Sequence, residues 1–178
     1  MNRAAFIDRD GVINEDRAYV YRVADFHFIP GAVTALRVLR QAGFLLVVIT
    51  NQSGIARGLF SEDDYRKLEA HMRARLSEAG VSLDSIQYCP HGPDGDCDCR
   101  KPKPGMILAA ARQLDIDLSQ SILIGDRTAD LAAGRAAGVG RCCLVRSGEP
   151  LSDSDVLRAD GVYEDLDACA RDVIRSAG

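Results

Sequence analysis

Short apolar runs punctuate this chain at regular intervals, separated by longer segments of mixed polarity. These runs predict buried strands at residues 4–7, 44–50, 85–89, 121–125 and 141–145, with a possible edge strand at 161–163. Strands that are separated by helices favour parallel pairing with right-handed crossovers. The pattern therefore favours a parallel sheet lying between two layers.

The segments between the runs carry apolar residues at helical spacing. One helix is predicted over 31–43, which ends at a glycine, and a second over 61–79, which opens with Ser61 and Asp64 in the spacing of a capping box. Three more helices are expected, one starting near Pro104, one from Thr128 to Gly138 and one over 165–175. Alternating strands and helices predict an α/β protein, a three-layer α/β/α sandwich with a doubly wound, mainly parallel sheet.

Size and charge narrow the range of functions. The 178 residues fit one domain, residues 1–178, with a sizeable core. The formal net charge of −4 argues against nucleic acid as a partner, so any anion must be bound by a local group of cations. The N-terminal apolar segment is too short for a signal peptide, and no run approaches the length of a membrane span. We expect a cytoplasmic enzyme that does not bind membranes.

The stretch FIDRDGVIN places Asp8 and Asp10 directly after the first predicted strand. Neighbouring carboxylates at a strand end can share one Mg²⁺, which offsets their repulsion and attracts a phosphate group. One carboxylate can then attack phosphorus while the other handles the proton of the leaving group. Asp-x-Asp-Gly also occurs in calcium loops and in ordinary turns, so the motif alone leaves both interpretations open.

Three further polar motifs adjoin predicted strands. They are ITNQSG at 49–54, CRKPKPG at 99–105 and IGDRTAD at 124–130. Polar residues at the carboxyl ends of parallel strands meet at one edge of a sheet, where ligands bind in doubly wound folds. The motifs can therefore build one active site.

Cysteine usage provides a second signal, in the segment CPHGPDGDCDC. Two closely spaced ligand pairs joined by a short polar loop suit tetrahedral Zn²⁺, and the ligands are Cys89, His91, Cys97 and Cys99. Free thiols or a disulfide are the alternatives, although a disulfide is unexpected without a secretory signal. Four protein ligands leave no open position, so this zinc loop at 89–99 is predicted to be structural and to hold the neighbouring Arg100 and Lys101 in place.

The ordered set DRDG, TNQSG, RKP and GDRTAD resembles the haloacid dehalogenase (HAD) superfamily of phosphohydrolases, in its zinc-containing, nearly capless branch. The phrases TNQSGIARGLF, LVRSGEP and DRAYVYRVADFHFIPG are similar to members that act on a heptose bisphosphate. The resemblance implies removal of the C7 phosphate from a heptose 1,7-bisphosphate, in the supply of nucleotide-activated heptose for lipopolysaccharide. The short loop between His91 and Cys97 is similar to members that act on histidinol phosphate, which is the alternative substrate.

The resemblance also implies roles for individual residues. Asp8 is the expected nucleophile and Asp10 the acid and base. Mg²⁺ is expected between Asp8, Asp126 and the backbone carbonyl of Asp10, since charge neutralisation and positioning dominate phosphoryl transfer. Thr50 and Lys101 are expected to contact the transferred phosphoryl oxygens, where loss of one donor typically costs on the order of 10²-fold in rate.

The expected substrate is a small phosphorylated sugar bound by a monomer. Arg100 is expected to bind the distal, uncleaved phosphate, with a surface ion pair as the alternative. The other residues expected to contact substrate are Asp16, Arg17, Ala18, Tyr19, Asn51, Gln52, Ser53 and Arg127. Asp130 has two possible roles, to orient Lys101 or to stabilise the first turn of a helix.

Two interpretations from other classes were weighed. Receiver domains of signalling proteins also combine paired carboxylates, a phosphorylated Asp, a Thr and a Lys on a doubly wound sheet. They usually place the phosphorylated Asp after the third strand, whereas the candidate nucleophile here follows the first. A protein-binding zinc loop on an inactive scaffold is the other interpretation, yet every catalytic position carries the required residue type.

Overall fold

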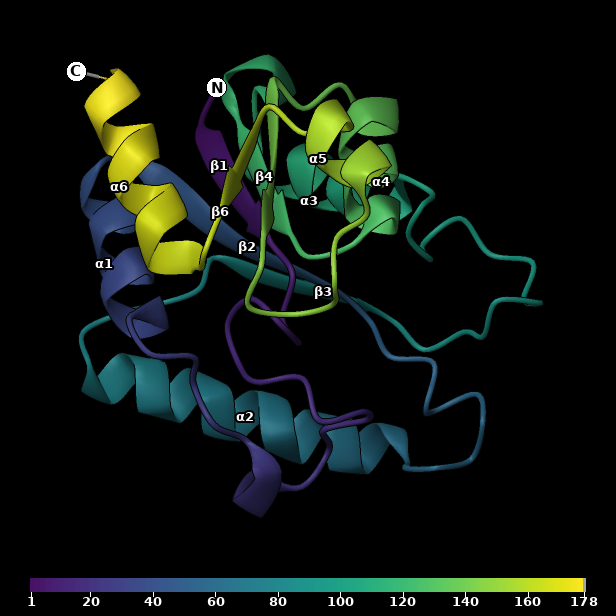
Figure 1. Ribbon diagram of the computed structural model, residues 1–178. Coiled ribbons are helices and arrows are strands. Elements are labelled where there is room, and N and C mark those ends of the chain that lie inside the picture. The colour runs from purple at the N-terminus through teal and green to yellow at the C-terminus, as the bar shows by residue number, and fades with distance from the viewer. Residues whose placement is uncertain (178) are drawn as a thin grey trace.

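Six strands form one sheet in the order β3-β2-β1-β4-β5-β6, and each neighbouring pair is parallel (Figure 1). The computed structural model describes residues 1–177. Its strands are β1 (Arg3–Ile7), β2 (Phe44–Asn51), β3 (Ser85–Cys89), β4 (Ile122–Gly125), β5 (Arg141–Val145) and β6 (Gly161–Tyr163). The predicted doubly wound, parallel α/β sheet is confirmed. Its chain order reverses between β1 and β4, which is where ligands bind in such folds.

The helices are α1 (Ala32–Gln41), α2 (Glu62–Glu78), α3 (Gly105–Leu114), α4 (Thr128–Ala137), α5 (Asp153–Arg158) and α6 (Leu166–Ala177). Two short 3₁₀ helices, η1 (Val23–Asp25) and η2 (Leu118–Gln120), complete the order. The capping box predicted for Ser61 and Asp64 is present at the start of α2. The sequence pattern did not predict α5, because its six residues are too few to show amphipathic periodicity.

The two faces of the sheet support two hydrophobic clusters. Alternate side chains of each strand point to opposite faces, so Ala5 and Ile7 of β1 pack with α1, α2 and α6, whereas Ala4 and Phe6 pack with α3 and α4. Figure 1 shows α1 and α6 on one side of the strands and α3 and α4 on the other, with α2 crossing near one end. This is the predicted three-layer arrangement.

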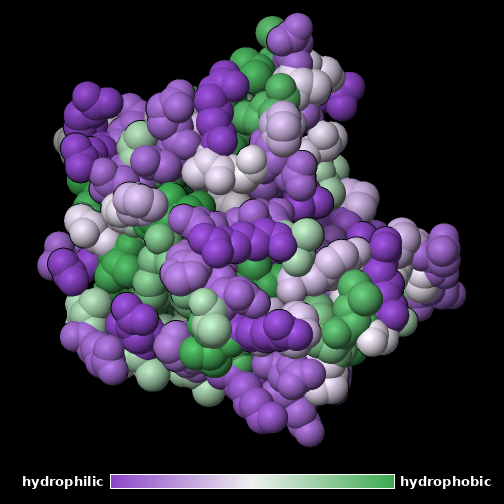
Figure 2. Space-filling model, turned by 60° about the horizontal axis from the view of Figure 1, so that its bottom comes forward, coloured by the Kyte–Doolittle hydropathy of each residue, from purple (hydrophilic) through white to green (hydrophobic). Residues whose placement is uncertain are grey.

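The loops that follow β1, β2, β4 and β5 all leave from the same edge of the sheet, as parallel pairing requires. Figure 2 turns this end of the molecule toward the viewer, and hydrophilic side chains cover most of it, with hydrophobic ones in small separate patches. Among the helices of residues 1–177, none has the length and apolar character needed to cross a bilayer.

Candidate active site

The first motif places Asp8 at the end of β1, beside the end of β4. The backbone N–H of Asp8 donates to the carbonyl of Ile124 at 3.0 Å, which extends the β1–β4 pairing by one residue. The chain then turns at Gly11, whose φ is +84° and where a Cβ would lie 2.4 Å from Asp126 Oδ2. Only glycine meets both conditions, so the glycine of DRDG lets the loop after β1 and the loop after β4 approach each other.

Lys101 forms the centre of the buried polar network. Its ammonium group donates to Asp130 Oδ1 at 2.7 Å and to the carbonyl of Ile49 at 3.1 Å, and it forms an ion pair with Asp8 Oδ1 at 3.0 Å. Two of its three N–H groups thus have hydrogen-bond acceptors, and the side chain is only 4% exposed. The contacts tie the ends of β1 and β2 to the start of α4.

Asp130 performs both of the roles that the sequence left open. One carboxylate oxygen pairs with Lys101, and the other accepts from the backbone N–H groups of Asp126 and Arg127 at 3.1 and 3.0 Å. Thr128, which was expected to cap α4, instead donates from its hydroxyl to Asp155. The carboxylate of Asp130 thus orients the lysine and caps the first turn of the helix at once.

Asp126 supplies an observation that points to a cation. Its Oδ2 accepts the backbone N–H of Glu149 at 3.0 Å, but its Oδ1 is buried and has no hydrogen-bond partner. Oxygens of Asp8, Asp126 and Asp130 lie within 4.8 Å of one another. Three carboxylates and one ammonium sum to a formal charge of −2, and the half-exposed Arg127 guanidinium approaches Asp126 Oδ1 only to 3.9 Å. Buried charge of this kind requires compensation. A hard divalent cation with a preference for oxygen ligands, such as Mg²⁺, fits this donor set.

The ionisation of these groups reflects the same crowding. Burial, together with the nearby Asp130 and Asp126 carboxylates, raises the pKa of Asp8 well above its usual value despite the Lys101 ammonium. Burial and Asp130 raise the pKa of Asp126 to about 6. Burial alone would lower the pKa of Lys101, but Asp130 and Asp8 outweigh it and the pKa is raised, so the lysine stays charged. Bound Mg²⁺ favours the ionised carboxylates.

The Asp10 carboxylate is directed away from this cluster and is held by three side chains. Arg9 donates to both of its oxygens at 2.9 and 3.0 Å, Asn14 donates to Oδ1 at 3.0 Å, and Gln52 donates to Oδ2 at 3.1 Å. Arg9 is itself buried and also donates to the carbonyl of Val20. The carboxylate therefore has a fixed place on the wall of the cleft, separate from the group that can hold a metal.

The TNQSG motif is joined by hydrogen bonds to Lys101, which follows the zinc loop. Asn51 and Lys101 exchange two hydrogen bonds, each 3.1 Å long, between the Asn51 amide and the Lys101 backbone. Gln52 donates to the Thr50 hydroxyl oxygen at 2.8 Å, which leaves the Thr50 hydroxyl proton available for a ligand. These contacts fix both the hydroxyl and the ammonium that were expected to meet the phosphoryl group.

A cleft of about 560 Å³ opens above this network. The residues predicted from the sequence that line it are Asp8, Asp10, Asp16, Arg17, Ala18, Tyr19, Thr50, Asn51, Gln52, Ser53, Arg100, Lys101 and Arg127. Asp126 is fully buried and does not line this cleft, although its carboxylate belongs to the cluster around Asp8. Sequence reasoning did not assign Ala129, Gly148 and Glu149, which also line the cleft, and it left Arg57 open as part of a flap or a plain loop.

Arg127 joins two loops across the mouth of the cleft. Its Nη2 lies 3.0 Å from Asp16 Oδ2 and 3.0 Å from Glu149 Oε1. Glu149 thus takes part twice, through its side chain toward Arg127 and through its backbone toward Asp126. One feature of the sequence pointed to Glu149. It belongs to LVRSGEP, the segment that leads out of the parallel strand β5.

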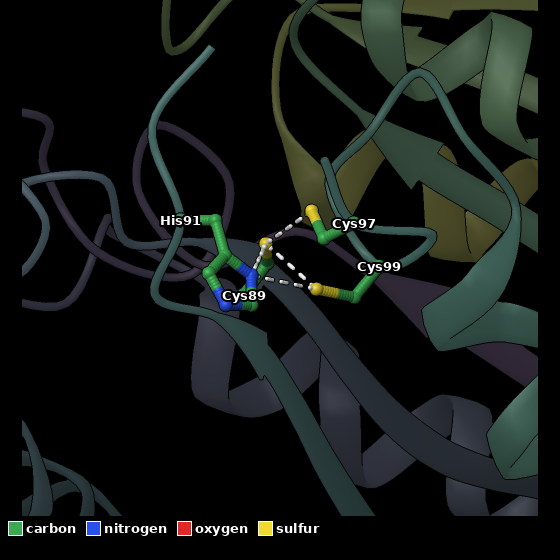
Figure 3. Close-up of side chains that lie close together, drawn as sticks. All are labelled: Cys89, His91, Cys97 and Cys99. Carbon is green, nitrogen blue, oxygen red and sulfur yellow. Dashed lines mark hydrogen bonds between the residues drawn. The ribbon is translucent and has the colours of Figure 1, made fainter. Parts of the chain in front are cut away.

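The zinc loop brings its four candidate ligands together (Figure 3). The Sγ atoms of Cys89 and Cys97 lie 3.8 Å apart, and His91 Nδ1 lies 3.5 Å from Cys89 Sγ and 3.3 Å from Cys99 Sγ. Tetrahedral Zn²⁺ with Zn–S bonds of about 2.3 Å spaces sulfurs by about 3.8 Å, which the Cys89–Cys97 pair matches, whereas the Sγ atoms of Cys89 and Cys99 lie closer, at 2.9 Å. The donor set of three thiols and one imidazole is that of a structural zinc site. Burial raises the pKa of the Cys89 thiol to about 12 without metal, whereas a coordinating thiol is deprotonated.

Comparison with known proteins agrees with the site. The family model described as HAD-hydrolase-like matches residues 98–169. The D-glycero-beta-D-manno-heptose-1,7-bisphosphate 7-phosphatase of Haemophilus influenzae is 48% identical over 172 residues, covering 93% of this chain and 94% of the relative. The enzyme of the same name from Pasteurella multocida is 45% identical over 172 residues, with the same coverage.

Solved structures lead to the same group. The crystal structure of the D,D-heptose 1,7-bisphosphate phosphatase from B. bronchiseptica, complexed with magnesium and phosphate, superposes with a TM-score of 0.88 at 37% identity, covering 98% of this chain and 99% of that one. The chain is therefore a HAD-like hydrolase and belongs to the family of heptose-1,7-bisphosphate 7-phosphatases. This membership sets aside the receiver-domain interpretation.

The zinc centre yields a direct test by metal analysis. Purified protein is expected to contain about one zinc per chain, and Cys97→Ser should bind zinc at least about tenfold more weakly because one of four ligands is weakened. Cys142→Ala is the matched control, since Cys142 is a buried thiol outside the cluster. Equal zinc contents in the two variants would show that Cys97 is not a ligand.

Proposed function

We propose that this protein removes the C7 phosphate from a heptose 1,7-bisphosphate by way of an aspartyl-phosphate intermediate. The observation that carries the proposal is the convergence of Asp8, Lys101 and Asp126 in a network with one buried carboxylate oxygen that accepts no hydrogen bond, beneath a cleft lined by further arginines. The names of the closely similar relatives support the choice of substrate. The product is a heptose 1-phosphate, a precursor for nucleotide-activated heptose.

The chemistry divides into two displacements at phosphorus. A carboxylate oxygen of Asp8 attacks the C7 phosphoryl group, the bond between phosphorus and the C7 oxygen breaks, and Asp10 gives its proton to that oxygen. In the second half, Asp10 takes a proton from water as the water oxygen attacks phosphorus, which releases inorganic phosphate and restores the Asp8 carboxylate.

The fixed cations and donors lower the barrier to these steps. We assign Mg²⁺ to the carboxylates of Asp8 and Asp126 and the backbone carbonyl of Asp10, where the ion neutralises charge on the phosphoryl oxygens. Lys101 already faces Asp8 at 3.0 Å, so its charge lies beside the point where the transferred group will form its new bond. The free Thr50 hydroxyl proton is a further donor, and none of these groups has to be reorganised for the reaction.

The substrate is held by the two loops that border the cleft. Asp16 to Tyr19 form one wall, and Ala18 and Tyr19 both have positive φ, at 52° and 59°, a conformation that non-glycine residues keep only when their surroundings impose it. Asn51 to Ser53 also line the cleft. We assign these residues to the sugar. Arg127 is assigned to another substrate oxygen, which replaces one of its two carboxylate partners, Asp16 or Glu149.

Arg100 suits the distal phosphate at C1. Its Nη1 donates to the carbonyl of His91 at 3.2 Å, and it has no acidic partner within residues 1–177. The surface ion pair that was the alternative for this side chain is thus not formed there. A guanidinium with free donors at the cleft can bind two phosphate oxygens in a fork.

Substrate preference tests the proposed function. We expect kcat/KM for phosphate release in the presence of Mg²⁺ to be much higher with a heptose 1,7-bisphosphate than with histidinol phosphate, because two phosphates use both ends of the cleft. Both anomers of the bisphosphate should be compared, with an Asp8→Asn preparation as the background control. A preference for histidinol phosphate would contradict the proposal.

Replacement of Arg100 tests the distal phosphate separately. Arg100→Ala should lower kcat/KM for the bisphosphate by about tenfold or more, since a charge-assisted hydrogen bond contributes about 1.5–3 kcal/mol. The 7-monophosphate should be affected little, because it lacks the group that Arg100 binds. Arg112→Ala, an exposed arginine on α3, serves as the control for loss of positive charge. Equal losses on both substrates would remove this role from Arg100.

A further inference from the structure

The five basic side chains that line the cleft differ in whether they already have an acidic partner. Arg17 pairs with Glu15, and Arg127 pairs with Asp16 and Glu149. Lys101 pairs with Asp8 and Asp130. These cations are largely neutralised before any ligand arrives. The remaining two basic side chains of the cleft are Arg57 and Arg100.

Arg57 is exposed and has no salt-bridge partner among residues 1–177. Its guanidinium carbon lies 5.9 Å from the centroid of the Tyr19 ring, a loose cation–π contact. Tyr19 also lines the cleft and presents a 41% exposed side chain. Arg57 is therefore held at the rim by an aromatic face, with its donors left for a ligand.

The loops that carry Arg57 and Arg100 are joined through the zinc loop. The N–H of Ala56 donates to the carbonyl of Pro90 at 3.2 Å, and Arg100 donates to the carbonyl of the next residue, His91, at 3.2 Å. Pro90 lies between the zinc ligands Cys89 and His91. The carbonyls of Pro90 and His91 thus hold the backbone next to Arg57 and the side chain of Arg100.

We infer that Arg57 shares the distal phosphate of the substrate with Arg100, so that two guanidiniums from neighbouring loops bind the uncleaved phosphate. The inference rests on the proposed function, because it requires a substrate with two phosphates. Asp8, Lys101 and the metal site serve the phosphoryl group that is transferred. The dianionic distal phosphate is left to cations that have no other partner, and only Arg57 and Arg100 meet this condition among the cleft residues.

The test compares Arg57→Gln and Arg57→Lys with the wild type on heptose 1,7-bisphosphate and on heptose 7-phosphate. Arg57→Gln should reduce kcat/KM for the bisphosphate about tenfold, mainly through KM, and change that for the monophosphate less than about twofold. Arg57→Lys should lie between, since it keeps the charge but loses the planar fork. Inhibition by heptose 1-phosphate, the product that keeps the distal phosphate, should weaken in parallel.

Arg22→Gln is the matched control. Arg22 also lies over a tyrosine ring, 5.2 Å from the centroid of Tyr21, yet it does not line the cleft. Its kinetic constants should equal those of the wild type on both substrates.

Two outcomes overturn the inference and are distinct from each other. A wild-type enzyme that prefers histidinol phosphate to the bisphosphate removes the proposed function and the role of Arg57 together. A wild-type enzyme that prefers the bisphosphate, with Arg57→Gln lowering activity equally on bisphosphate and monophosphate, keeps the proposed function and assigns Arg57 to the sugar or to the loop instead.

Discussion

The contact between the Lys101 ammonium and the carboxylates of Asp8 and Asp130 is the interaction on which the rest of the site depends. The three carboxylates of Asp8, Asp126 and Asp130 have oxygens within 4.8 Å of one another, in a region where burial opposes charge. One lysine cannot neutralise all three. Asp126 Oδ1 accepts no hydrogen bond, and the Arg127 guanidinium comes no closer to it than 3.9 Å. This excess of buried negative charge lowers the stability of the fold, and it also favours binding of a divalent cation, which in turn attracts a phosphate.

The supports of this network come from segments far apart in the sequence, which explains how a small fold keeps the reacting groups in place. The Lys101 backbone is fastened to Asn51, the Asp126 carboxylate to the backbone of Glu149, and the Arg100 side chain to the carbonyl of His91. The segment 89–99 supports this arrangement, because the carbonyl of His91 accepts from Arg100 and the carbonyl of Pro90 accepts from the backbone N–H of Ala56, next to Arg57. In the proposed function, catalysis and substrate recognition therefore depend on different loops at the same edge of the sheet.

Much of the fold was predictable because parallel strands covered on both faces leave uninterrupted apolar runs, and the polar motifs after them must meet at one edge. The clustering of Cys89, His91, Cys97 and Cys99 was predictable from their spacing. The rest depends on contacts that no local pattern encodes. Arg57 and Glu149 are ordinary charged residues in loops until the chain folds. The buried pairing of Arg9 with Asp10, and the double role of Asp130, follow from three-dimensional approach and not from propensity.

The most direct test of this account is to identify the residue that carries the phosphoryl group during turnover. Enzyme mixed with substrate and Mg²⁺ is quenched in acid and treated with borohydride, which reduces an aspartyl-phosphate to homoserine, and the site is located by mass spectrometry. The account predicts homoserine at position 8 in the wild type and no modification in the inactive Asp8→Asn variant. Modification at another carboxylate, or full turnover by Asp8→Asn, would contradict it.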